Sequence, residues 1–167
     1  EMTSSLVGSE MCIRDSADWN DCLRLGKKGE STFVAFQLYY AMSMMHELAA
    51  ARGDAEYISY LDKVQKELGD ALAACWDDDR FIRGIREDGV VVGAKKDPEA
   101  SMWLNPQSWS VISGFASKEQ SDKAMQSVAD ILDTPYGAKL LDPPYIDHYF
   151  DAVSYTHLRA HETRRHL

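Results

Sequence analysis

The sequence has little that would tie it to a membrane, to nucleic acid or to a disulfide framework. It contains no run of about 18 apolar residues, so we expect no membrane-spanning helix. The formal net charge of -9 would repel a phosphate backbone and argues against nucleic acid as a partner. The three cysteines form no CxxC pair, which favours free, inert thiols in the reducing cytoplasm. Neutral polar ligands remain compatible with this composition.

Motifs for common cofactors are also absent. The sequence has no P-loop, no dinucleotide-binding glycine pattern, no GxSxG and no metal-ligand spacing. We therefore expect neither a cofactor nor a metal site. With 45% hydrophobic and 27% charged residues, the composition is that of an ordinary globular protein.

The two ends of the chain differ in composition from its middle. Residues 1–16 show neither a helical nor a strand period, and residues 154–167 hold three of the five histidines. Such a tail could bind metal or acidic surfaces. Both ends, however, resemble translated sequencing-adapter sequence. We expect a non-native leader (1–16), a natural segment (17–153) that continues in a longer protein, and a non-native tail (154–167).

A helical hairpin is predicted in the first half of the natural segment. Residues 30–52 are apolar on more than one face, which is typical of a helix buried between other elements, and Gly53 can end that helix. Asp54 is a suitable N-cap for a second helix reaching to about Trp76, whose apolar residues form a single stripe. The first helix is therefore expected to be inner and the second outer.

A β-hairpin and a second pair of helices are expected next. Residues 80–93 are β-branched around Asp88-Gly89, a strong hairpin signal. Asn105 is expected to cap a helix that has Pro106 at its first position.

Ser117, with Gln120 three residues later, predicts a capping box and a further helix. The class is thus all-α with a small β-hairpin insertion. Two helical hairpins would leave their inner helices poorly covered, so we expect low stability for this piece alone.

The tetrapeptide Asp18-Trp19-Asn20-Asp21 is the sharpest local feature. Cleavage of a glycosidic bond needs a carboxylic acid to protonate the leaving oxygen, and an indole offers an apolar face to a sugar ring. The alternative is turn chemistry, in which Asp and Asn cap backbone groups and Trp packs.

Four segments together resemble glycoside hydrolase family 94, the inverting glycoside phosphorylases. They are ADWNDCL (17–23), GES (29–31), WLNPQSWSVISG (103–114) and LLDPPY (140–145). The resemblance implies part of an (α/α)6 barrel. It also implies inverting phosphorolysis of a β-linked disaccharide or oligosaccharide to an α-sugar-1-phosphate, with inorganic phosphate as co-substrate. Family members often form dimers, which implies a homodimeric parent enzyme.

The resemblance also implies roles for individual residues. Asp21 matches the general acid, Trp19 the tryptophan beside the cleaved ring, and Asp18 a residue that binds this ring or fixes the loop. Gln107 and Trp109 belong to the third segment and either line the pocket or pack. The family's phosphate-binding groups lie mostly in other segments.

Glu30 is open to a simpler interpretation, as a carboxylate favoured by a helix N-terminus. Two other function classes also stay open. A hydrolase on the same barrel would need a second carboxylate to activate water. A helical-repeat interaction module would need a sustained repeat period, and the sequence has none.

Overall fold

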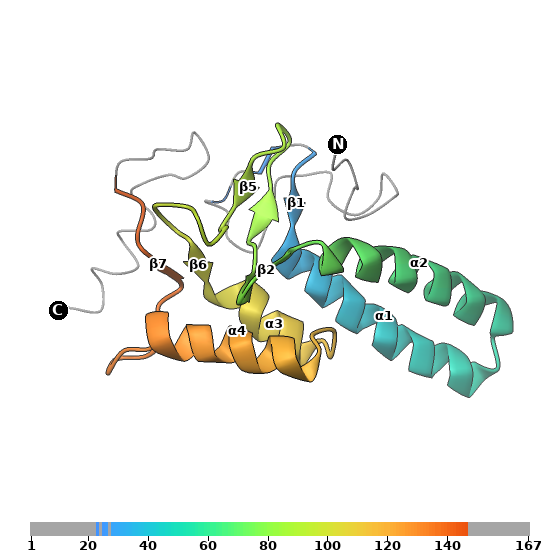
Figure 1. Cartoon of the computed structure of the whole chain (residues 1–167). Coiled ribbons are helices and arrows are strands. Elements are labelled where there is room, and N and C mark those ends of the chain that lie inside the picture. The colour runs from blue at the N-terminus through green and yellow to red at the C-terminus, as the bar shows by residue number, and fades with distance from the viewer. Residues whose placement is uncertain (1–22, 24, 27, 147–167) are drawn as a thin grey trace.

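The computed structural model describes residues 23, 25, 26 and 28–146. The described part contains four helices and seven two-residue strands, which form small antiparallel sheets (Figure 1). Helices predominate, as the sequence predicted. In chain order the elements are β1 (Glu30–Ser31), α1 (Thr32–Arg52), α2 (Ala55–Ala73), β2 (Trp76–Asp77), β3 (Arg80–Phe81), β4 (Gly84–Ile85), β5 (Val91–Val92), β6 (Met102–Trp103), α3 (Leu104–Ile112), α4 (Lys118–Ile131) and β7 (Leu141–Asp142).

The first helical hairpin is confirmed, with the predicted signals at its turn. Gly53 ends α1 with φ of 69°, a conformation that glycine adopts at little cost. The side chain of Asp54 then caps α2 by accepting a hydrogen bond from the Tyr57 N–H. The second helix is shorter than expected and ends at Ala73, because Trp76 belongs to β2 and pairs with β3.

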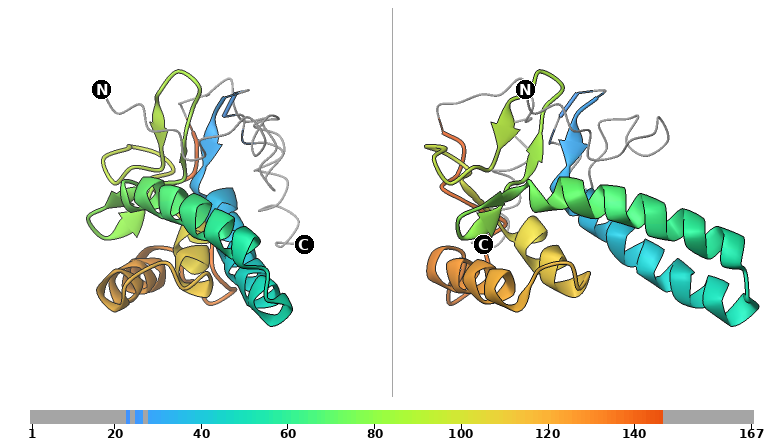
Figure 2. Two further views of the ribbon diagram at one scale, coloured as in Figure 1. Left: turned by 90° about the vertical axis from the view of Figure 1, so that its right-hand side faces the viewer. Right: turned by 45° about the vertical axis from the view of Figure 1, so that its right-hand side comes forward.

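The far half of α1 is poorly covered, as expected for the inner helix of a piece with only two helical hairpins. In its distal half Met44 is 52% and Leu48 59% exposed. The physical reason is visible in Figures 1 and 2, where the far half of the α1–α2 hairpin projects beyond all other described elements. Aromatic contacts from α3 and the turn after it reach α1 only as far as Tyr40.

The start of α3 differs from the expected Asn105 cap. The helix begins at Leu104, so Pro106 is its third residue, and the N-cap position, Trp103, makes no side-chain cap bond. A neighbouring chain segment satisfies the first helical donor instead, since the Leu104 N–H donates to the Leu140 carbonyl at 2.9 Å. A hydrogen bond to a distant chain segment therefore takes the place of a local side-chain cap at the start of α3.

The start of α4 agrees with the sequence. The Ser117 hydroxyl accepts from the Gln120 N–H, and the Gln120 side chain accepts from the Ser117 N–H, which completes the predicted capping box.

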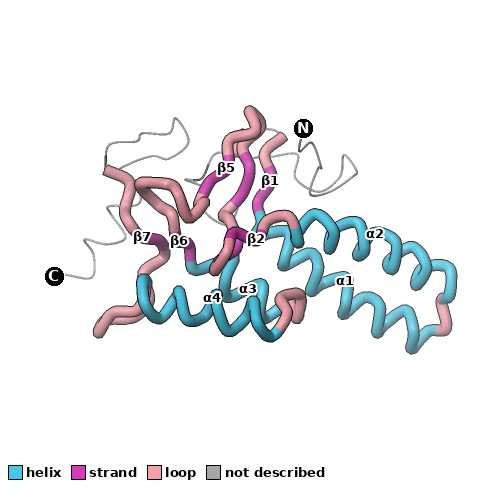
Figure 3. The backbone as a smooth tube through the Cα atoms, in the orientation of Figure 1, coloured by secondary structure: helices cyan, strands magenta, loops and turns pink. Residues whose placement is uncertain are grey.

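Short strands gather at the end of the helical hairpin where α1 begins (Figure 3). The predicted hairpin around Asp88-Gly89 is formed by β4 and β5, and β1 extends it to the order β1-β4-β5. A separate pair, β6-β7, sets Trp103 opposite Leu141.

The main apolar core lies between α1, α2 and the β2-β3 pair. Cys75 lies within this core, where burial raises the pKa of its thiol to about 11, as expected for an inert cysteine. The other two cysteines, Cys12 and Cys22, lie outside the described residues. Within the described ranges, every helix is too short or too polar to cross a bilayer.

Candidate functional site

Described residues of the four family-like segments meet in one place. Leu23, Trp103 and Leu141 are buried in a single apolar cluster, although they come from three of these segments. Ser31, from the fourth, lies in β1 beside β4. Segments more than 100 residues apart in sequence thus share one small core at the strand-rich end of the molecule.

Arg83 is the polar centre of this place and is 0% exposed. Its guanidinium lies 5.2 Å from the centroid of the Trp103 ring and 5.7 Å from that of Phe33. Both distances are within the range of a cation–π interaction. Its Nη1 donates to the Ser31 hydroxyl at 2.9 Å. Gly93 lies against the Cβ of Arg83 and the indole of Trp103, where there is no room for a Cβ on residue 93.

Trp103 also makes specific contacts. Its indole Nε1 donates to the Ala100 carbonyl at 2.8 Å, and its ring packs against Tyr145 of the LLDPPY segment. Burial raises the pKa of the Tyr145 hydroxyl above its ordinary range, and the charge of Asp97 adds to this. Tyr145 is therefore a neutral phenol at physiological pH.

The segment that follows the DWND tetrapeptide is anchored on the β4–β5 hairpin. The Leu25 carbonyl accepts a hydrogen bond from the Glu87 N–H at 2.9 Å. Gly26 has φ of 87° and touches the Glu87 side chain, which leaves no room for a side chain at Gly26. Since Leu23 and Leu25 are both buried, several contacts fix the segment that follows the tetrapeptide.

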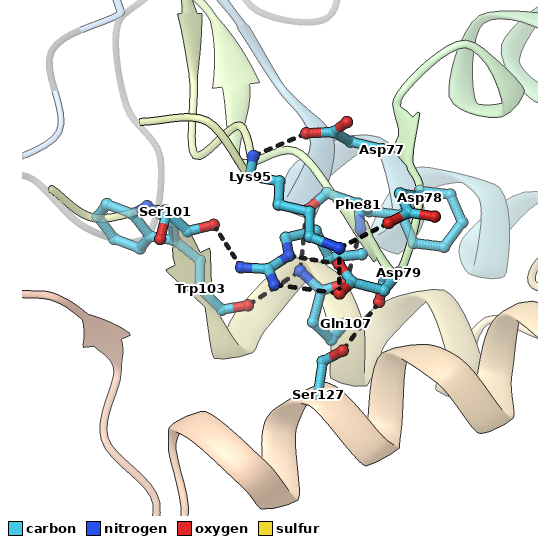
Figure 4. Close-up of polar contacts among 10 residues, drawn as sticks. Asp77, Asp78, Asp79, Phe81, Lys95, Ser101, Trp103, Gln107 and Ser127 are labelled. Carbon is cyan, nitrogen blue, oxygen red and sulfur yellow. Dashed lines mark hydrogen bonds and ion pairs between the residues drawn. The ribbon is translucent and has the colours of Figure 1, made fainter. Parts of the chain in front are cut away.

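Gln107 is 0% exposed, and the hydrogen bonds of its carboxamide go to backbone groups. Its Oε1 accepts from the Phe81 N–H and its Nε2 donates to the Phe81 carbonyl, both at 2.8 Å (Figure 4). A second bond from Nε2 reaches the Trp103 carbonyl at 3.1 Å. These contacts agree with the packing alternative, and sugar binding by Gln107 stays a prediction.

Trp109 lies on a different side of α3, since two residues along a helix are about 200° apart. The half-buried indole packs edge-on against Phe33, at 5.9 Å between ring centroids, and against Tyr40. Its role as a pocket residue also stays a prediction. Glu30 is in β1 and precedes the Ser31 N-cap of α1, so it is not a first-turn helix carboxylate.

A charged network joins the β2-β3 turn to the chain after β5 (Figure 4). Asp79 accepts from Arg80 Nε at 2.7 Å and from Lys95 Nζ at 2.9 Å, and Arg80 also donates to the Ser101 carbonyl. Partial burial by itself would raise the pKa of Asp79, but these two cations lower it below 3.8. The network holds these two stretches of chain together. No cluster of three or more potential metal ligands occurs in the part of the chain that the structure covers.

The acid-bearing tetrapeptide itself, with Asp18, Trp19 and Asp21, lies outside the described residues, and its roles stay predictions. Arg83 is the residue that the sequence interpretation missed. Its signal was present, however, as a cation between apolar residues in a strand-like run that also contains Phe81 and Ile85. A charge at such a position is rarely buried without a specific contact.

Comparison with known proteins shows to which family a chain with these segments belongs. The family model described as "Glycosyl hydrolase 94 superfamily, catalytic domain" matches residues 1–160. This range includes the expected leader and part of the expected tail, and the division of the chain at residues 16 and 154 stays a prediction.

Several curated relatives are similar over most of the chain. A 3-O-beta-D-glucopyranosyl-beta-D-glucuronide phosphorylase of Paenibacillus borealis is 36% identical over 140 residues, which is 81% of this chain and 18% of that protein. A cellobionic acid phosphorylase of Neurospora crassa is 38% identical over 136 residues, covering 77% and 17%. An N,N'-diacetylchitobiose phosphorylase of Vibrio furnissii is 38% identical over 152 residues, covering 87% and 18%.

The chain spans less than a fifth of the length of these relatives. The matched segment contains the four motifs whose described residues meet around Arg83 and Trp103. The chain therefore belongs to the glycosyl hydrolase 94 superfamily, as part of its catalytic domain.

Proposed function

We propose that this chain is the segment of an inverting glycoside phosphorylase that carries the general acid, Asp21. The whole enzyme would convert a β-linked disaccharide or oligosaccharide and inorganic phosphate into an α-sugar-1-phosphate and a shortened acceptor. The supporting observation is that Leu23, two residues after Asp21, is anchored in the core formed by the other family segments. The three relatives compared above are themselves named as phosphorylases.

The reaction needs one carboxyl group from this segment. Protonated Asp21 transfers its hydrogen to the bridging oxygen while that oxygen leaves with the bonding electron pair. A phosphate oxygen attacks the anomeric carbon from the opposite face and forms the new bond with inversion. Phosphate is already an anion at neutral pH, so no second carboxylate is needed as a base, in contrast to an inverting hydrolase.

Asp21 must hold its proton until the leaving oxygen takes it. A raised pKa, through burial or through the negative charge of phosphate, would keep it protonated. We assign Trp19 to the apolar face of the cleaved ring and Asp18 to binding this ring or fixing the loop. In this proposal Gln107 and Trp109 belong to the wall around the pocket. The phosphate-binding cations belong to the rest of the catalytic domain, and no cofactor is required.

Chain geometry limits how far the acid can lie from the described core. Only one residue separates Asp21 from Leu23 in the sequence, and consecutive Cα atoms are about 3.8 Å apart. The acid is thereby tied to the cluster that contains Trp103 and Leu141.

For the fold we propose a part of an (α/α)6 barrel, in which α1 is an inner helix. The supporting observation is the exposed apolar surface of its distal half, which includes Met44 and Leu48. Further helices of the same domain would cover this surface. A homodimeric parent enzyme and a cytoplasmic location complete the proposal.

The test uses the full-length enzyme that carries this segment. It is incubated with inorganic phosphate and with each disaccharide named for the relatives: N,N'-diacetylchitobiose, cellobionic acid, solabiose and the glucosyl-glucuronide. We expect one of them to give a sugar-1-phosphate of α configuration, as identified by NMR. Release of free sugar without phosphate would identify a hydrolase instead.

The role of Asp21 is tested with Asp21→Asn. The amide keeps the size of the side chain and cannot donate an acidic proton, so turnover should fall by at least about 10²-fold while sugar binding remains. Asp133→Asn, which alters an exposed carboxylate in the turn after α4, is the matched control. Near-normal turnover of Asp21→Asn would refute the assignment.

A further inference from the structure

Two arginines of the described chain are almost fully buried, and their surroundings differ. Arg80 is 4% exposed and forms a two-pronged contact with its neighbour Asp79. Arg83 is 0% exposed and lies within cation–π distance of two aromatic rings, with the Ser31 hydroxyl as an acceptor.

Burying a guanidinium is costly, and a well-packed apolar side chain often serves stability as well or better. Stability of the core is therefore a poor explanation for a cation at this position. What the guanidinium adds over an apolar side chain is directional contact, because its planar donors and faces fix the groups around it.

The groups in contact with Arg83 lie near the two ends of the segment that follows the DWND tetrapeptide, from residue 23 to residue 31. Through Ser31 and a backbone hydrogen bond from the Thr32 N–H to its own carbonyl, Arg83 holds the end of that segment where α1 begins. Arg83 also lies 5.2 Å from the centroid of the Trp103 ring, and Trp103 belongs to the cluster in which Leu23, the beginning of the segment, is buried.

We propose that Arg83 is a positioning residue for the proton transfer: in contact with the Phe33 and Trp103 rings and hydrogen-bonded to Ser31, it sets the place of Leu23 and thereby that of the Asp21 carboxyl. This inference rests on the proposed function of Asp21. Arg83 has no exposed atom, so it acts through the chain and not by touching substrate.

Misplacement of a catalytic group by about 1 Å can cost on the order of 10²-fold in rate. The effect should depend on the leaving group. A disaccharide needs a proton on its leaving oxygen, whereas a 2,4-dinitrophenyl β-glycoside of the same sugar releases a stable phenolate and needs little help from the acid. A displaced acid therefore slows the first substrate and spares the second.

The experiment measures kcat and KM of the full-length enzyme for both substrates with phosphate, using the disaccharide that the panel identifies. Arg83→Met should lower kcat for the disaccharide by about 10- to 100-fold at similar KM, and that for the aryl glycoside by less than about 3-fold. Arg83→Lys keeps the charge but lacks the planar fork, so it should recover part of the loss. Arg80→Met is the matched control, a buried arginine of the charged network, and it should leave the ratio of the two kcat values unchanged.

If the ratio of the kcat values for the two substrates is unchanged in Arg83→Met, because both kcat values fall equally or neither falls, Arg83 only stabilises the fold. That result would overturn the inference. If Arg83→Met does not fold, Arg83→Lys and Ser31→Ala decide it by the same ratio. Asp21→Asn is measured in parallel. If that variant keeps its disaccharide activity, the proposed function has failed; if it loses activity while the Arg83 ratio stays unchanged, only this inference has failed.

Discussion

The Gln107 carboxamide pairs with both backbone groups of Phe81, as a neighbouring strand would, with two hydrogen bonds of 2.8 Å. A helix side chain thereby completes the edge of the β2-β3 pair (Figure 4). This relationship ties α3 to the main core and accounts for a glutamine in a position without solvent contact.

Gln107→Leu should be strongly destabilising, because it leaves the buried N–H and C=O of Phe81 without partners. Each such group costs about 1–3 kcal/mol. Chemical denaturation of the 167-residue chain would measure the loss in free energy of unfolding. Gln126→Leu, which removes only an exposed hydrogen bond to Asp130, should change it by less than about 0.5 kcal/mol. Equal effects of the two substitutions would contradict the role of Gln107.

Gly93→Ala should lower the free energy of unfolding far more than Gly89→Ala, although both glycines have positive φ within or next to the same hairpin. A methyl group at Gly89 meets no atom within 4 Å, so only the left-handed backbone penalty of about 1–2 kcal/mol applies. At Gly93 the new Cβ would lie 2.8 Å from the Arg83 Cβ and 2.9 Å from the Trp103 Cδ1, which adds about 1–3 kcal/mol of overpacking.

The difference between these two variants in free energy of unfolding isolates the steric contribution. Its absence would mean that Arg83 and Trp103 are less tightly held than the structure indicates.

Met44→Lys combined with Leu48→Lys tests what covers α1. In the 167-residue chain both side chains are largely exposed, and the double variant should keep its stability within about 1 kcal/mol and bind less of an apolar dye. In the full-length enzyme the barrel proposal buries them, so the same change should lower the melting temperature markedly. An unaltered melting temperature of the full-length variant would argue against an inner position of α1.

Asp79→Asn should reduce the dependence of stability on acidic pH. The pKa of Asp79 is lower in the folded than in the unfolded chain, so its ionised form stabilises the fold above its unfolded pKa. That contribution is lost as the pH falls through the folded value, below about 4. Unfolding free energies at about pH 6 and pH 3 should therefore differ less in the variant than in the natural chain. Asp133→Asn controls for the change in net charge, and an equal difference in all three proteins would refute the contribution of Asp79.

Local signals in the sequence were sufficient for most of the helix and hairpin ends. Gly53, Asp54 and the Ser117 capping box act within a few residues of chain, and the structure has each of them where they were predicted. The start of α3 could not be predicted in this way, because its first donor bonds to Leu140, far along the chain. The packing of Gln107 against Phe81 is a long-range contact of the same kind.

The sequence by itself determined the succession of helices and hairpin and, through four short segments, the family. The succession of elements depends on neighbouring residues, and the family resemblance depends on the order of the motifs. Both can be seen directly in the sequence. Only the tertiary structure decided that Leu23, Ser31, Trp103 and Leu141 meet, and that a buried Arg83 stands among them. Burial and cation–π contact arise when distant segments fold onto one another. The pattern of residues along the sequence does not show which of these segments will come into contact.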